Sequence, residues 1–565
     1  MSVSQLLENL DQHQDEYKSI VAYCRKLYHQ EIQEFHKFLL YLEDETARGD
    51  EESENLLRKE YHLLEDPTVP KLLREILEIG FAYRLKYSPD KGEFAGLSSD
   101  VVEVLESGNG TKYIVNYHLL TDYIQKRYCV VTYKKINYIY LNGMFVEDDG
   151  FIGKKIENIL VYKGVADKKK IRDTVAEVLA RLSWRSFLTK FPFNSFGREF
   201  IPCANGVLWR SELGYRLLPF SPAFGYTYRI PVKYDPKAQC PKIDKFISEV
   251  VSEDARQILY EIPASCLLQS SEFHFAYMLV GSGSNGKSTY LKLLERFLGK
   301  ENISNVSLQE LCEDRFKAAE LVGKLANIHA DIPKKAIKYT GKFKMLTGGD
   351  TITVEKKYKD PFSFTNTARL IFSANELPEV SDKTYAFWRR WIIVEFPNKF
   401  PPNPDLIREL TTDEELSGFL NQVLRAMERI ELLGRPTMTD AVEKAMEKWM
   451  RQSNSVYAFV QDCLERDINS FELKDVVYDC YKEYCDINDL NPVSKNVFAR
   501  ELQRFIKVRS ERKKIQGERK RVWAGIRIKW GYFERKGEQE EESGTLEEFL
   551  DNKSAFEEFL EGDEP

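Results

Sequence analysis

Residues 279–289 read Leu-Val-Gly-Ser-Gly-Ser-Asn-Gly-Lys-Ser-Thr, and Gly281 to Ser288 fits the pattern G-x-x-x-x-G-K-[ST] without a mismatch. Phe273–Val280 is an apolar run of strand length, and Tyr290–Leu298 is apolar at helical spacing. We therefore predict that the motif joins a strand to a helix, as a phosphate-binding loop does. The alternative is a Gly- and Ser-rich turn that fits by chance, and the flanking strand and helix argue against it.

Every residue type in this loop suits a nucleoside triphosphate. Glycines let backbone N–H groups curl around phosphate oxygens at the positive end of a helix. Lys287 is expected to reach the β- and γ-phosphates, and the Ser288 hydroxyl to ligand Mg²⁺. The sequence thus predicts ATP and Mg²⁺ as cofactors, with nucleotide contacts from Gly281, Ser282, Gly283, Ser284, Asn285, Gly286, Lys287, Ser288 and Thr289.

Length and composition bound the class of protein. A chain of 565 residues exceeds one core and suggests three or four domains. Hydrophobic content of 43% and aromatic content of 13% indicate a globular protein. No stretch approaches the roughly 18 uninterrupted apolar residues of a membrane span, and the polar N-terminus does not resemble a signal peptide. The nine cysteines form no C-x-x-C pair, so we expect buried thiols in a cytosolic, unsecreted protein rather than a zinc site.

Charge is strongly segregated near the C-terminus. Residues 538–565 carry twelve acidic residues against Lys553, a net −11, so the rest of the chain carries +4 although the whole chain has −7. Residues 500–529 carry twelve Lys and Arg against three Glu, a net +9. A basic block followed by an acidic block suggests a nucleic-acid-facing module with a regulatory or partner-binding tail. The alternatives are a solvated basic face and a solvated, disordered acidic tail.

Changes in hydrophobic periodicity along the sequence divide the chain into parts, and we predict an α/β multidomain protein. Residues 128–140 and 226–234 alternate like strands, residues 169–182 read as a helix, and residues 243–268 read as one helix entering the nucleotide-binding strand. The predicted parts are a helical region at 1–105, an α+β domain at 106–240, an ATPase core at 241–400, a helical linker or lid at 401–452, a winged-helix domain at 453–530 and an acidic tail at 531–565.

A second strand of the core ends in a carboxylate. Leu325–Ala330 reads as a strand, and Asp331 follows it about where a P-loop ATPase needs an acid for Mg²⁺. The alternative is an ordinary strand-terminal aspartate. His329 is interpreted as a packed strand residue rather than a ligand.

Two short alternating runs then flank Lys356-Lys357-Tyr358-Lys359, which predicts a hairpin with a basic and aromatic tip. Lysines neutralise phosphates and an aromatic ring stacks on a base, so such a tip suits single-stranded nucleic acid. The alternative is a turn of solvated lysines.

Two further polar positions follow strands of the core. Asn375 follows the run Ala368–Ala374, where an amide can orient the attacking water or sense the γ-phosphate; a turn-forming Asn is the alternative. Arg389 and Arg390 precede the run Ile392–Phe396. In a ring ATPase an arginine reaches the neighbouring subunit's γ-phosphate, and structural ion pairing is the alternative.

The order of these motifs along the chain resembles that of superfamily 3 helicases. The motifs are the phosphate loop, the strand that ends at Asp331, L-T-G-G-D with the lysine hairpin, I-F-S-A-N-E-L-P and W-R-R. The resemblance is to the branch of phage, plasmid and poxvirus primase-helicases. It extends upstream through Cys203-Ala-Asn-Gly-Val207 and Val232–Pro236, and downstream to Val522–Ile526, over roughly residues 110–530.

The resemblance implies an AAA+-like ATPase core in a hexameric ring that translocates on single-stranded DNA and unwinds forked duplex during replication. It implies a virus or plasmid protein in the host cytoplasm. Lys287 and Ser288 would bind phosphate and Mg²⁺, Asp331 would be the Walker B acid and Asn375 the sensor. Lys356 and Lys357 would lie on the DNA-gripping hairpin, and Arg389 or Arg390 would be the finger. Independently of the resemblance, the basic block at residues 500–529 predicts that Arg519, Lys520 and Arg521 bind DNA.

Two departures from that family matter. Many relatives carry two adjacent acids at the end of the Walker B strand, whereas Ala330 and Ile332 flank Asp331, so the general base is unassigned. Residues 1–105 are too short, and lack the paired carboxylates, for the primase domain often fused upstream, so we expect no priming activity. A helicase-primase with priming in the N-terminal half remains one alternative. An origin-binding ATP switch without motor activity remains another.

Overall fold

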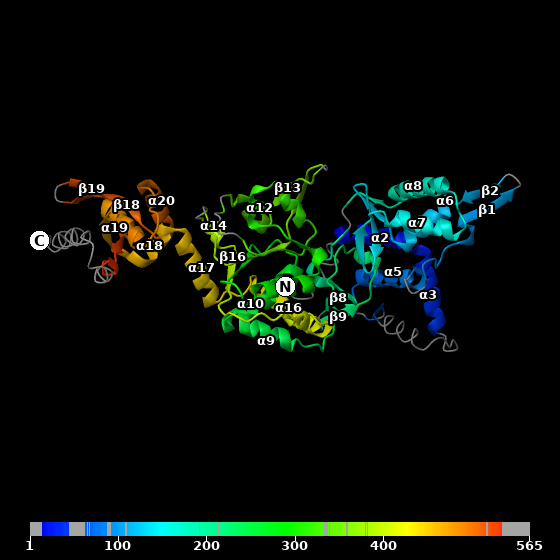
Figure 1. Ribbon diagram of the computed structural model, residues 1–565, viewed down its shortest axis with the longest axis horizontal. Coiled ribbons are helices and arrows are strands. Elements are labelled where there is room, and N and C mark those ends of the chain that lie inside the picture. The colour runs from blue at the N-terminus through cyan, green and yellow to red at the C-terminus, as the bar shows by residue number, and fades with distance from the viewer. Residues whose placement is uncertain are drawn as a thin grey trace. The chain divides into compact units, whose positions relative to one another are not determined.

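The computed structural model describes residues 14–43, 63–64, 66, 68–87, 92–107, 110–190, 193–211, 214–332, 337, 339–357, 360–378, 380, 382, 384–515 and 518–533. The chain divides into two compact units, each of which is described by itself (Figure 1). The first comprises Met1–Ile332, Gly341–Glu376 and Val394–Thr439. The second comprises Pro333–Thr340, Leu377–Ile393 and Asp440–Pro565. Of the acidic tail predicted at 531–565, residues 531–533 belong to the second unit's core, where Phe533 is 1% exposed, and residues 534–565 fall outside the described residues.

Helices open the first unit, as predicted. They are α2 (Gln14–Leu27), α3 (His29–Glu43) and α5 (Lys71–Tyr87). Helices α3 and α5 pack through the stacked rings of Phe35 and Phe81, whose centroids lie 5.3 Å apart. After these helices, β1 (Val102–Ser107) pairs antiparallel with β2 (Gly110–Val115).

A mixed α+β region follows. Its elements are α6 (Tyr117–Arg127), β3 (Val131–Tyr133), β4 (Ile136–Leu141), β5 (Met144–Glu147), α7 (Phe151–Tyr162), α8 (Lys168–Arg185) and β6 (Phe187–Leu188). The sheet order is β5-β4-β3-β6, with β3 and β6 parallel. Buried Ile124, Ile156 and Leu182, one from each helix, share a single core. A second sheet joins β7 (Phe200–Cys203), β8 (Gly206–Ser211) and β9 (Gly214–Leu218).

The strand predicted over residues 226–234 is wrong. Tyr226, Tyr228, Ile230 and Val232 are buried in alternation, which produced the strand-like pattern. Their backbone groups make single hydrogen bonds to different partners, however: Phe145 N–H donates to the Tyr226 carbonyl at 2.6 Å, and Ala204 N–H to the Val232 carbonyl at 2.8 Å. The segment is therefore extended chain without a ladder of its own.

The region predicted to be an ATPase core contains a five-stranded sheet in the order β11-β12-β15-β10-β16. These strands are β10 (Ala276–Val280), β11 (Ile303–Ser304), β12 (Ala326–His329), β15 (Arg369–Ala374) and β16 (Trp391–Glu395). The pairs β11–β12, β12–β15 and β10–β15 are parallel, so their carboxyl ends share one edge of the sheet. Strands β10 and β15 are buried throughout, as expected for a sheet covered on both faces.

Helices and a hairpin surround this sheet. They are α9 (Pro241–Val250), α10 (Arg256–Leu267), α11 (Lys287–Leu298), α12 (Leu308–Glu313), α13 (Gly341–Gly348), α15 (Leu406–Leu410) and α16 (Asp413–Leu433), with β13 (Thr351–Val354) and β14 (Phe362–Thr365) as the hairpin. The single helix predicted over residues 243–268 is wrong. Val251 and Ser252 are extended, at φ −130° and −64°, and a short 3-10 turn precedes α10.

The second unit contains α14 (Tyr385–Trp388) and α17 (Asp440–Ser453), joined by aromatic packing. The Trp449 ring centroid lies 5.1 Å from that of Trp388 and 5.5 Å from that of Trp391, and its indole N–H donates to the Pro378 carbonyl at 2.8 Å. This cluster ties the loop after β15 to the helix that leads into the rest of the unit.

The remainder of the unit, here named the C-terminal module, is α18 (Ser455–Cys463), β17 (Leu464–Leu473), α19 (Lys474–Ile487), α20 (Lys495–Phe505), β18 (Arg509–Ile515) and β19 (Glu518–Ile528). Three helices pack on a sheet of order β17-β19-β18 around Phe459, Tyr481 and Phe498 (Figure 1). The sequence predicted a winged-helix domain here without placing strand β17, whose pairing with β19 is irregular between Arg466 and Phe471.

Candidate functional site

The glycine-rich motif forms the loop between β10 and α11, as predicted. Gly286 caps the helix with φ 90°, and a Cβ there would lie 2.6 Å from Val250 Cγ1. Gly281 is close to its neighbours for a different reason: a Cβ there would lie 2.0 Å from Asn285 Nδ2 and 2.7 Å from the Phe396 carbonyl oxygen. Both positions therefore require glycine.

The loop is fixed to the chain that follows β16. Asn285 Nδ2 donates to the Phe396 carbonyl at 3.3 Å, and Phe400 N–H donates to the Ser284 carbonyl at 2.8 Å. Asn285, at a variable position of the motif, is only 3% exposed. Its side chain connects the loop to Phe396 and so fixes the loop conformation next to Lys287.

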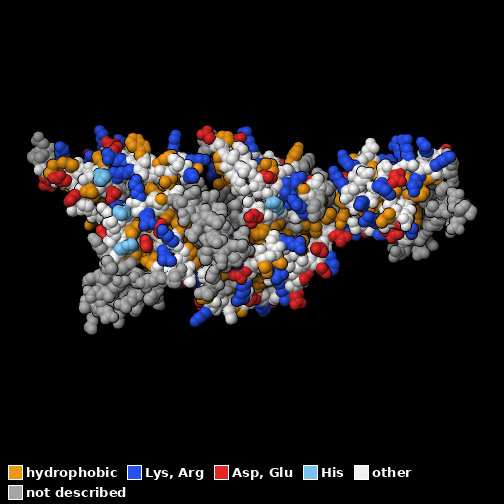
Figure 2. Space-filling view, turned by 180° about the vertical axis from the view of Figure 1, so that it is seen from behind, with side chains coloured by type: hydrophobic (Ala, Val, Ile, Leu, Met, Phe, Trp, Pro, Cys, Tyr) orange, Lys and Arg blue, Asp and Glu red, His pale blue; other side chains and the backbone are white. Residues whose placement is uncertain are grey.

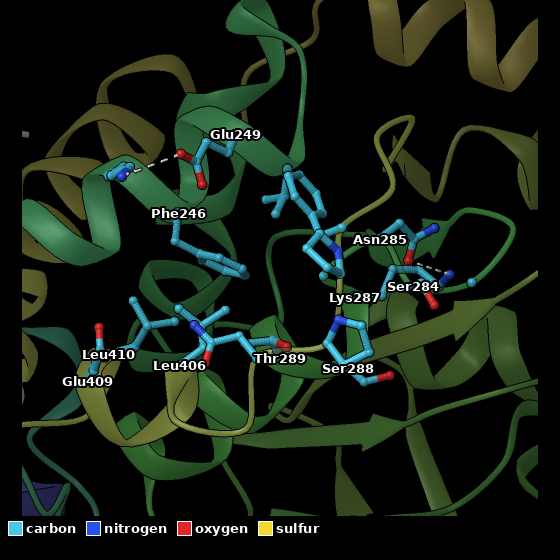
Figure 3. Close-up of a pocket in the computed structure, with 18 of the residues that line it drawn as sticks. Phe246, Glu249, Ser284, Asn285, Lys287, Ser288, Thr289, Leu406, Glu409 and Leu410 are labelled. Atoms are coloured by element: carbon cyan, nitrogen blue, oxygen red, sulfur yellow. Dashed lines mark hydrogen bonds and ion pairs between the residues drawn. The ribbon is translucent and has the colours of Figure 1, made fainter.

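Lys287 is buried at the base of the loop, and its ammonium is only partly neutralised. Its Nζ donates to the Gly281 carbonyl, to Asn285 Oδ1 at 3.1 Å and to Asn375 Oδ1 at 3.5 Å (Figure 3). Burial lowers the pKa of the Lys287 ammonium, and the charge of Asp331 acts in the opposite direction. A buried cation beside backbone N–H groups is suited to an anionic ligand.

Asp331 and Asn375 meet at the carboxyl ends of the neighbouring strands β12 and β15. Asp331 N–H donates to Ser373 Oγ at 3.3 Å, and Ile332 N–H donates to the Ser373 carbonyl at 2.8 Å. Asp331 adopts φ 56°, a left-handed conformation that costs a non-glycine residue free energy and recurs at functional sites. The structure thus brings together loop, acid and amide, as the sequence predicted for their positions.

A cavity of about 870 Å³ opens over this group. Ser288, Asp331 and Asn375 line it together with the loop. Across the pocket from the loop lie side chains of α9, of α15 and of the segment between β16 and α15 (Figure 3). The apolar ones, here named the apolar wall, are Phe246, Val250, Phe400, Pro401, Pro402, Leu406 and Leu410. The same segments also contribute Asn403 and the charged residues Lys242, Lys245, Glu249 and Glu409.

Sequence reasoning missed this apolar wall. Phe246 and Val250 are four residues apart on α9, a spacing that equally predicts a core-facing stripe. The one available signal was Pro401-Pro402, which marks an irregular segment just after the core. An apolar wall opposite a phosphate loop has the composition of a nucleobase pocket.

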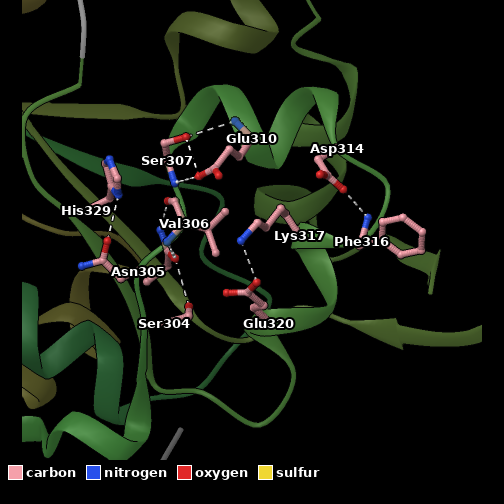
Figure 4. Close-up of polar contacts among 11 residues, drawn as sticks. Ser304, Asn305, Val306, Ser307, Glu310, Asp314, Phe316, Lys317, Glu320 and His329 are labelled. Atoms are coloured by element: carbon pink, nitrogen blue, oxygen red, sulfur yellow. Dashed lines mark hydrogen bonds and ion pairs between the residues drawn. The ribbon is translucent and has the colours of Figure 1, made fainter. Parts of the chain in front are cut away.

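His329 ends β12 and lies outside the cavity lining, but it is half-buried rather than fully packed. Its Nδ1 is 2.9 Å from Asn305 Oδ1, beside α12 (Figure 4). There Ser307 and Glu310 form a capping box, with the Ser307 N–H donating to Glu310 Oε2 at 3.0 Å. These contacts are separate from the residues that line the cavity.

The hairpin predicted around Lys356–Lys359 is confirmed. Strands β13 and β14 pair antiparallel from Thr351↔Thr365 to Val354↔Phe362. Lys356 and Lys357 are exposed at its end, while Tyr358 and Lys359 lie outside the described residues. The two predicted finger candidates differ: Arg389 is exposed, whereas Arg390 is 8% exposed and donates to the Ala386 carbonyl.

The three basic residues predicted for the C-terminal module lie on β19. Arg519 stands opposite Lys514, Lys520 opposite Lys513, and Arg521 opposite Arg512 on β18. Because side chains alternate between the faces of a strand, Lys520 lies on the opposite face from Arg519 and Arg521.

Other site types receive no support among the described residues. No group of three or more His, Cys, Asp and Glu is placed there to hold a metal ion. All nine cysteines are free and buried, as predicted. Within the same residues, no helix combines the length and the apolar character needed to cross a bilayer.

Three family models match separate parts of the chain. Residues 118–252 match the family described as D5 N terminal like, and residues 451–539 match the family described as Poxvirus D5 protein-like. Residues 279–390, which contain the site, match a family of unknown function, DUF5906. The chain resembles the D5-type primase-helicases, here called D5-like. These matches confirm the resemblance to the phage, plasmid and poxvirus primase-helicases that the sequence motifs predicted.

Curated relatives of the D5-like chain come from large DNA viruses and carry helicase names. The protein named "Putative helicase L207/L206" from Acanthamoeba polyphaga mimivirus is 30% identical over 176 residues, which cover 30% of this chain and 18% of that protein. "Putative helicase 121R" from Invertebrate iridescent virus 3 is 27% identical over 224 residues, covering 38% of this chain and 23% of that protein. The alignments therefore span less than a quarter of either relative.

Among solved structures, the A form apo structure of the NrS-1 C-terminal region matches with a TM-score of 0.42 and 12% sequence identity. The match covers 70% of the D5-like chain and 95% of that structure.

Proposed function

We propose that the D5-like chain is an ATP-dependent DNA helicase that works as a hexameric ring on single-stranded and forked DNA in viral replication. One observation carries the proposal: Lys287, Asp331 and Asn375, from three separate segments, converge on one cavity at the carboxyl edge of a parallel sheet. The D5-like matches and the helicase names of the viral relatives support it.

The residues around the cavity fit ATP and Mg²⁺. Ser288 hydroxyl and Asp331 carboxylate are hard oxygen donors of the kind that Mg²⁺ prefers, and both line the cavity. Bound there, Mg²⁺ would neutralise charge on the phosphates. The loop N–H groups and the Lys287 ammonium hold phosphate oxygens, the apolar wall takes the base, and Asn375 places an amide to orient water. The general base stays unassigned.

Assembly and DNA contact complete the proposed motor. Arg389, exposed beside the buried Arg390, suits a finger that completes the site of a neighbouring subunit. Lys356 and Lys357, with Tyr358 and Lys359 beyond the described residues, would grip single-stranded DNA. The C-terminal module, with its three helices and hairpin, would be a winged helix that contacts DNA. The acidic tail would bind a replication partner, and the host cytoplasm would be the place of action.

Strand separation on a forked duplex tests the proposal. The unmodified protein should displace a strand only with ATP and Mg²⁺, and Lys287→Ala should abolish displacement while keeping assembly and DNA binding. A protein that hydrolyses ATP but never separates strands would instead be a switch. A protein that hydrolyses no nucleoside triphosphate would overturn the proposal.

A further inference from the structure

The β18–β19 hairpin of the C-terminal module concentrates positive charge on one face. Arg512 stands directly opposite Arg521, and Lys514 directly opposite Arg519. Because side chains alternate between the faces of a strand, these four residues share one face, here named the cationic hairpin face. All four residues are exposed. Figure 2 shows Lys and Arg side chains gathered over this module, at the upper right of the view.

No acid of the hairpin balances this charge. Both of its acids, Glu511 and Glu518, lie on the other face of the two strands. Within the described part of the chain, none of the four side chains of the cationic hairpin face makes an ion pair or a hydrogen bond. Elsewhere in the module a cation is neutralised locally, since Arg527 pairs with Asp467 at 2.7 Å. The charges of the cationic hairpin face therefore lack such a partner in the described fold.

This arrangement costs stability unless an anion covers it. Like charges directly opposite each other destabilise a pair of antiparallel strands. The two like-charged pairs follow one another at about 7 Å, twice the rise of a strand. A carboxylate can accept charge-assisted hydrogen bonds from both members of a pair. The face therefore suits a ligand that carries several negative charges in a row.

Lys474 extends the positive charge toward the helices of the module. Its Nζ donates to Ser510 Oγ at 2.6 Å and lies 3.6 Å from the ring centroid of Trp523. Ser510 and Trp523 form the next pair on the same face of the hairpin. Burial lowers the pKa of the Lys474 ammonium, and the charge of Arg521 lowers it further. A polyanion along this row would relieve both repulsions.

The chain itself contains a polyanion. Residues 538–565 carry twelve acidic residues against Lys553. Within them, residues 547–551 read Glu-Glu-Phe-Leu-Asp and residues 557–561 read Glu-Glu-Phe-Leu-Glu. These segments, here named the two acidic elements, each hold three acids in five residues and no basic residue. Their charge is complementary to that of the cationic hairpin face.

The two acidic elements can reach this face from the module that they follow. Phe533 is 1% exposed in the core of the module, so the tail leaves from the module itself. Arg521 comes twelve residues before Phe533, which places the two at most about 40 Å apart at about 3.3 Å per residue. Glu547 comes fourteen residues after Phe533, a reach of up to about 46 Å by the same measure.

We propose that the two acidic elements occupy the cationic hairpin face of their own chain and compete with DNA for it. The inference rests on the proposed function in that this module contacts DNA. DNA that binds the module displaces the tail and so makes it available to another protein. The contact therefore couples DNA binding to exposure of the tail.

Cross-linking of the full-length protein tests the docking directly. A carbodiimide joins a lysine amine to a carboxylate that touches it, and Lys514 is the lysine of the cationic hairpin face. Peptides that join Lys514 to either acidic element should form, and should disappear when excess duplex DNA is added. Lys513, on the other face of the same strand, is the matched control and should give only background yield. Equal yields at Lys513 and Lys514, or none at Lys514, would overturn the docking.

A mixture of ordinary and isotope-labelled protein identifies whose tail is bound. The Lys514 cross-links should join peptides that carry the same label. Cross-links between labelled and unlabelled peptides in the proportion expected for random pairing would place the tail on a neighbouring copy and overturn docking within one chain.

Duplex affinity measures the competition. The tail variant Glu547→Gln with Glu548→Gln, Glu557→Gln and Glu558→Gln should bind a fluorescent duplex about tenfold more tightly at low salt. A tail at an effective concentration of roughly 1 mM that binds with a Kd of about 0.1 mM weakens a competitor by about this factor. The gain should shrink as added salt screens the charges. An unchanged affinity at low salt would overturn the competition.

Two backgrounds separate docking from repulsion of DNA at a distance. Arg519→Ala with Arg521→Ala removes half of the cationic hairpin face, so the tail substitutions should gain much less affinity there. Lys513→Ala with Lys520→Ala removes the same charge from the other face and should keep the tenfold gain. Equal gains in the two backgrounds would overturn docking on this face.

The outcomes also separate this proposal from the motor. Absence of the Lys514 cross-links in a protein that still separates strands with ATP would overturn only the docking. Cross-links that persist in excess DNA would overturn the competition, and with it the DNA contact assigned to this module. Cross-links that DNA displaces, in a protein that never hydrolyses a nucleoside triphosphate, would overturn only the motor.

Discussion

Lys287 and Asn375 are 88 positions apart in the sequence, yet the lysine Nζ donates to the asparagine Oδ1 at 3.5 Å. The link joins the phosphate loop to the end of β15. Since the same ammonium also contacts Gly281 and Asn285 of its own loop, a phosphate that draws the ammonium away from these oxygens frees Asn375. The amide then becomes available to a water molecule or to the γ-phosphate.

This relationship predicts different effects for the two residues. Lys287→Ala should lose nucleotide affinity and hydrolysis together, because it removes the charge that holds phosphate. Asn375→Ala should keep nucleotide affinity and lower kcat by about 10²- to 10³-fold, as for one positioned polar group at a reacting centre. Steady-state hydrolysis and binding of a fluorescent nucleotide measure the two quantities. Asn305→Ala, which removes an amide that contacts His329 instead, is the matched control and should leave both quantities unchanged.

Gly281 should tolerate no side chain. A Cβ would lie within 2.0 Å of Asn285 Nδ2, so Gly281→Ala must displace the amide that holds the loop to Phe396. We expect nucleotide affinity to fall more than about tenfold, the effect of losing about 1.4 kcal/mol of binding free energy. Gly341→Ala is the control, since a Cβ there meets nothing within 4 Å. Wild-type affinity in Gly281→Ala would contradict the role given to this contact.

The polar half of the site could be predicted from a motif and from strand ends. Lys287 belongs to the phosphate-loop motif, Asp331 and Asn375 each follow an apolar run, and carboxyl ends of adjacent parallel strands must meet at one edge. The apolar half could not be predicted in this way. Phe246 and Leu410 have the spacing of ordinary core residues, and only the folded chain decides whether a cavity or another side chain lies opposite.

The errors in the fold have a similar origin. The apolar periodicity of residues 243–268 continues through Val251 and Ser252, where the backbone is extended, so pattern alone joins α9 and α10. Tyr226–Val232 alternates in burial like a strand but makes only scattered backbone hydrogen bonds, to Phe145 of β5, to Pro202 of β7 and to Ala204. Strand β17 contains an irregularity that disturbs its alternation. In each case the long-range pairing of the backbone, which leaves no local trace, decided the structure.

Phe246 should contribute to binding but not to chemistry. It lines the apolar wall opposite the loop, so Phe246→Ala should raise the KM for ATP with little change in kcat. The loss should be about 1–3 kcal/mol if the ring stacks on the base. Leu433→Ala, an exposed apolar residue of α16, serves as the control and should not change KM. A fall in kcat with KM unchanged would place Phe246 in the catalytic step instead.

Arg389 and Arg390 should separate into a functional and a structural residue. Arg390 is buried and bonded to Ala386, so Arg390→Ala should lower the melting temperature. Arg389→Ala should fold normally and lose about 10³-fold or more in ATP hydrolysis, the contribution of an arginine finger.

Mixing variants tests whether Arg389 acts on a neighbouring subunit. Arg389→Ala and Lys287→Ala proteins are each expected to be inactive alone. A mixed ring pairs the intact loop of one subunit with the intact arginine of the other, so hydrolysis should return on mixing. Subunits that exchange without recovering any activity would show that Arg389 does not complete the adjoining site.

Glu472 should make the C-terminal module lose stability as the pH rises from about 4.5 to about 7. Its carboxyl group is 4% exposed and accepts a hydrogen bond from Ile528 N–H at 3.0 Å, and burial raises its pKa to about 7. Because the folded pKa lies above the unfolded value, stability is fully present below about pH 4.5 and declines as pH rises through 7. Full ionisation costs on the order of 3 kcal/mol, at about 1.4 kcal/mol per pH unit.

Hydrogen exchange of the Ile528 amide is a local measure of this effect in the full-length protein. After correction for the intrinsic pH dependence of exchange, its protection should decrease between about pH 4.5 and pH 7. Glu472→Gln keeps the hydrogen-bond acceptor but cannot ionise, so its protection should be independent of pH over this range. Identical pH profiles for the two proteins would mean that the carboxyl group of Glu472 titrates near its ordinary value in the fold.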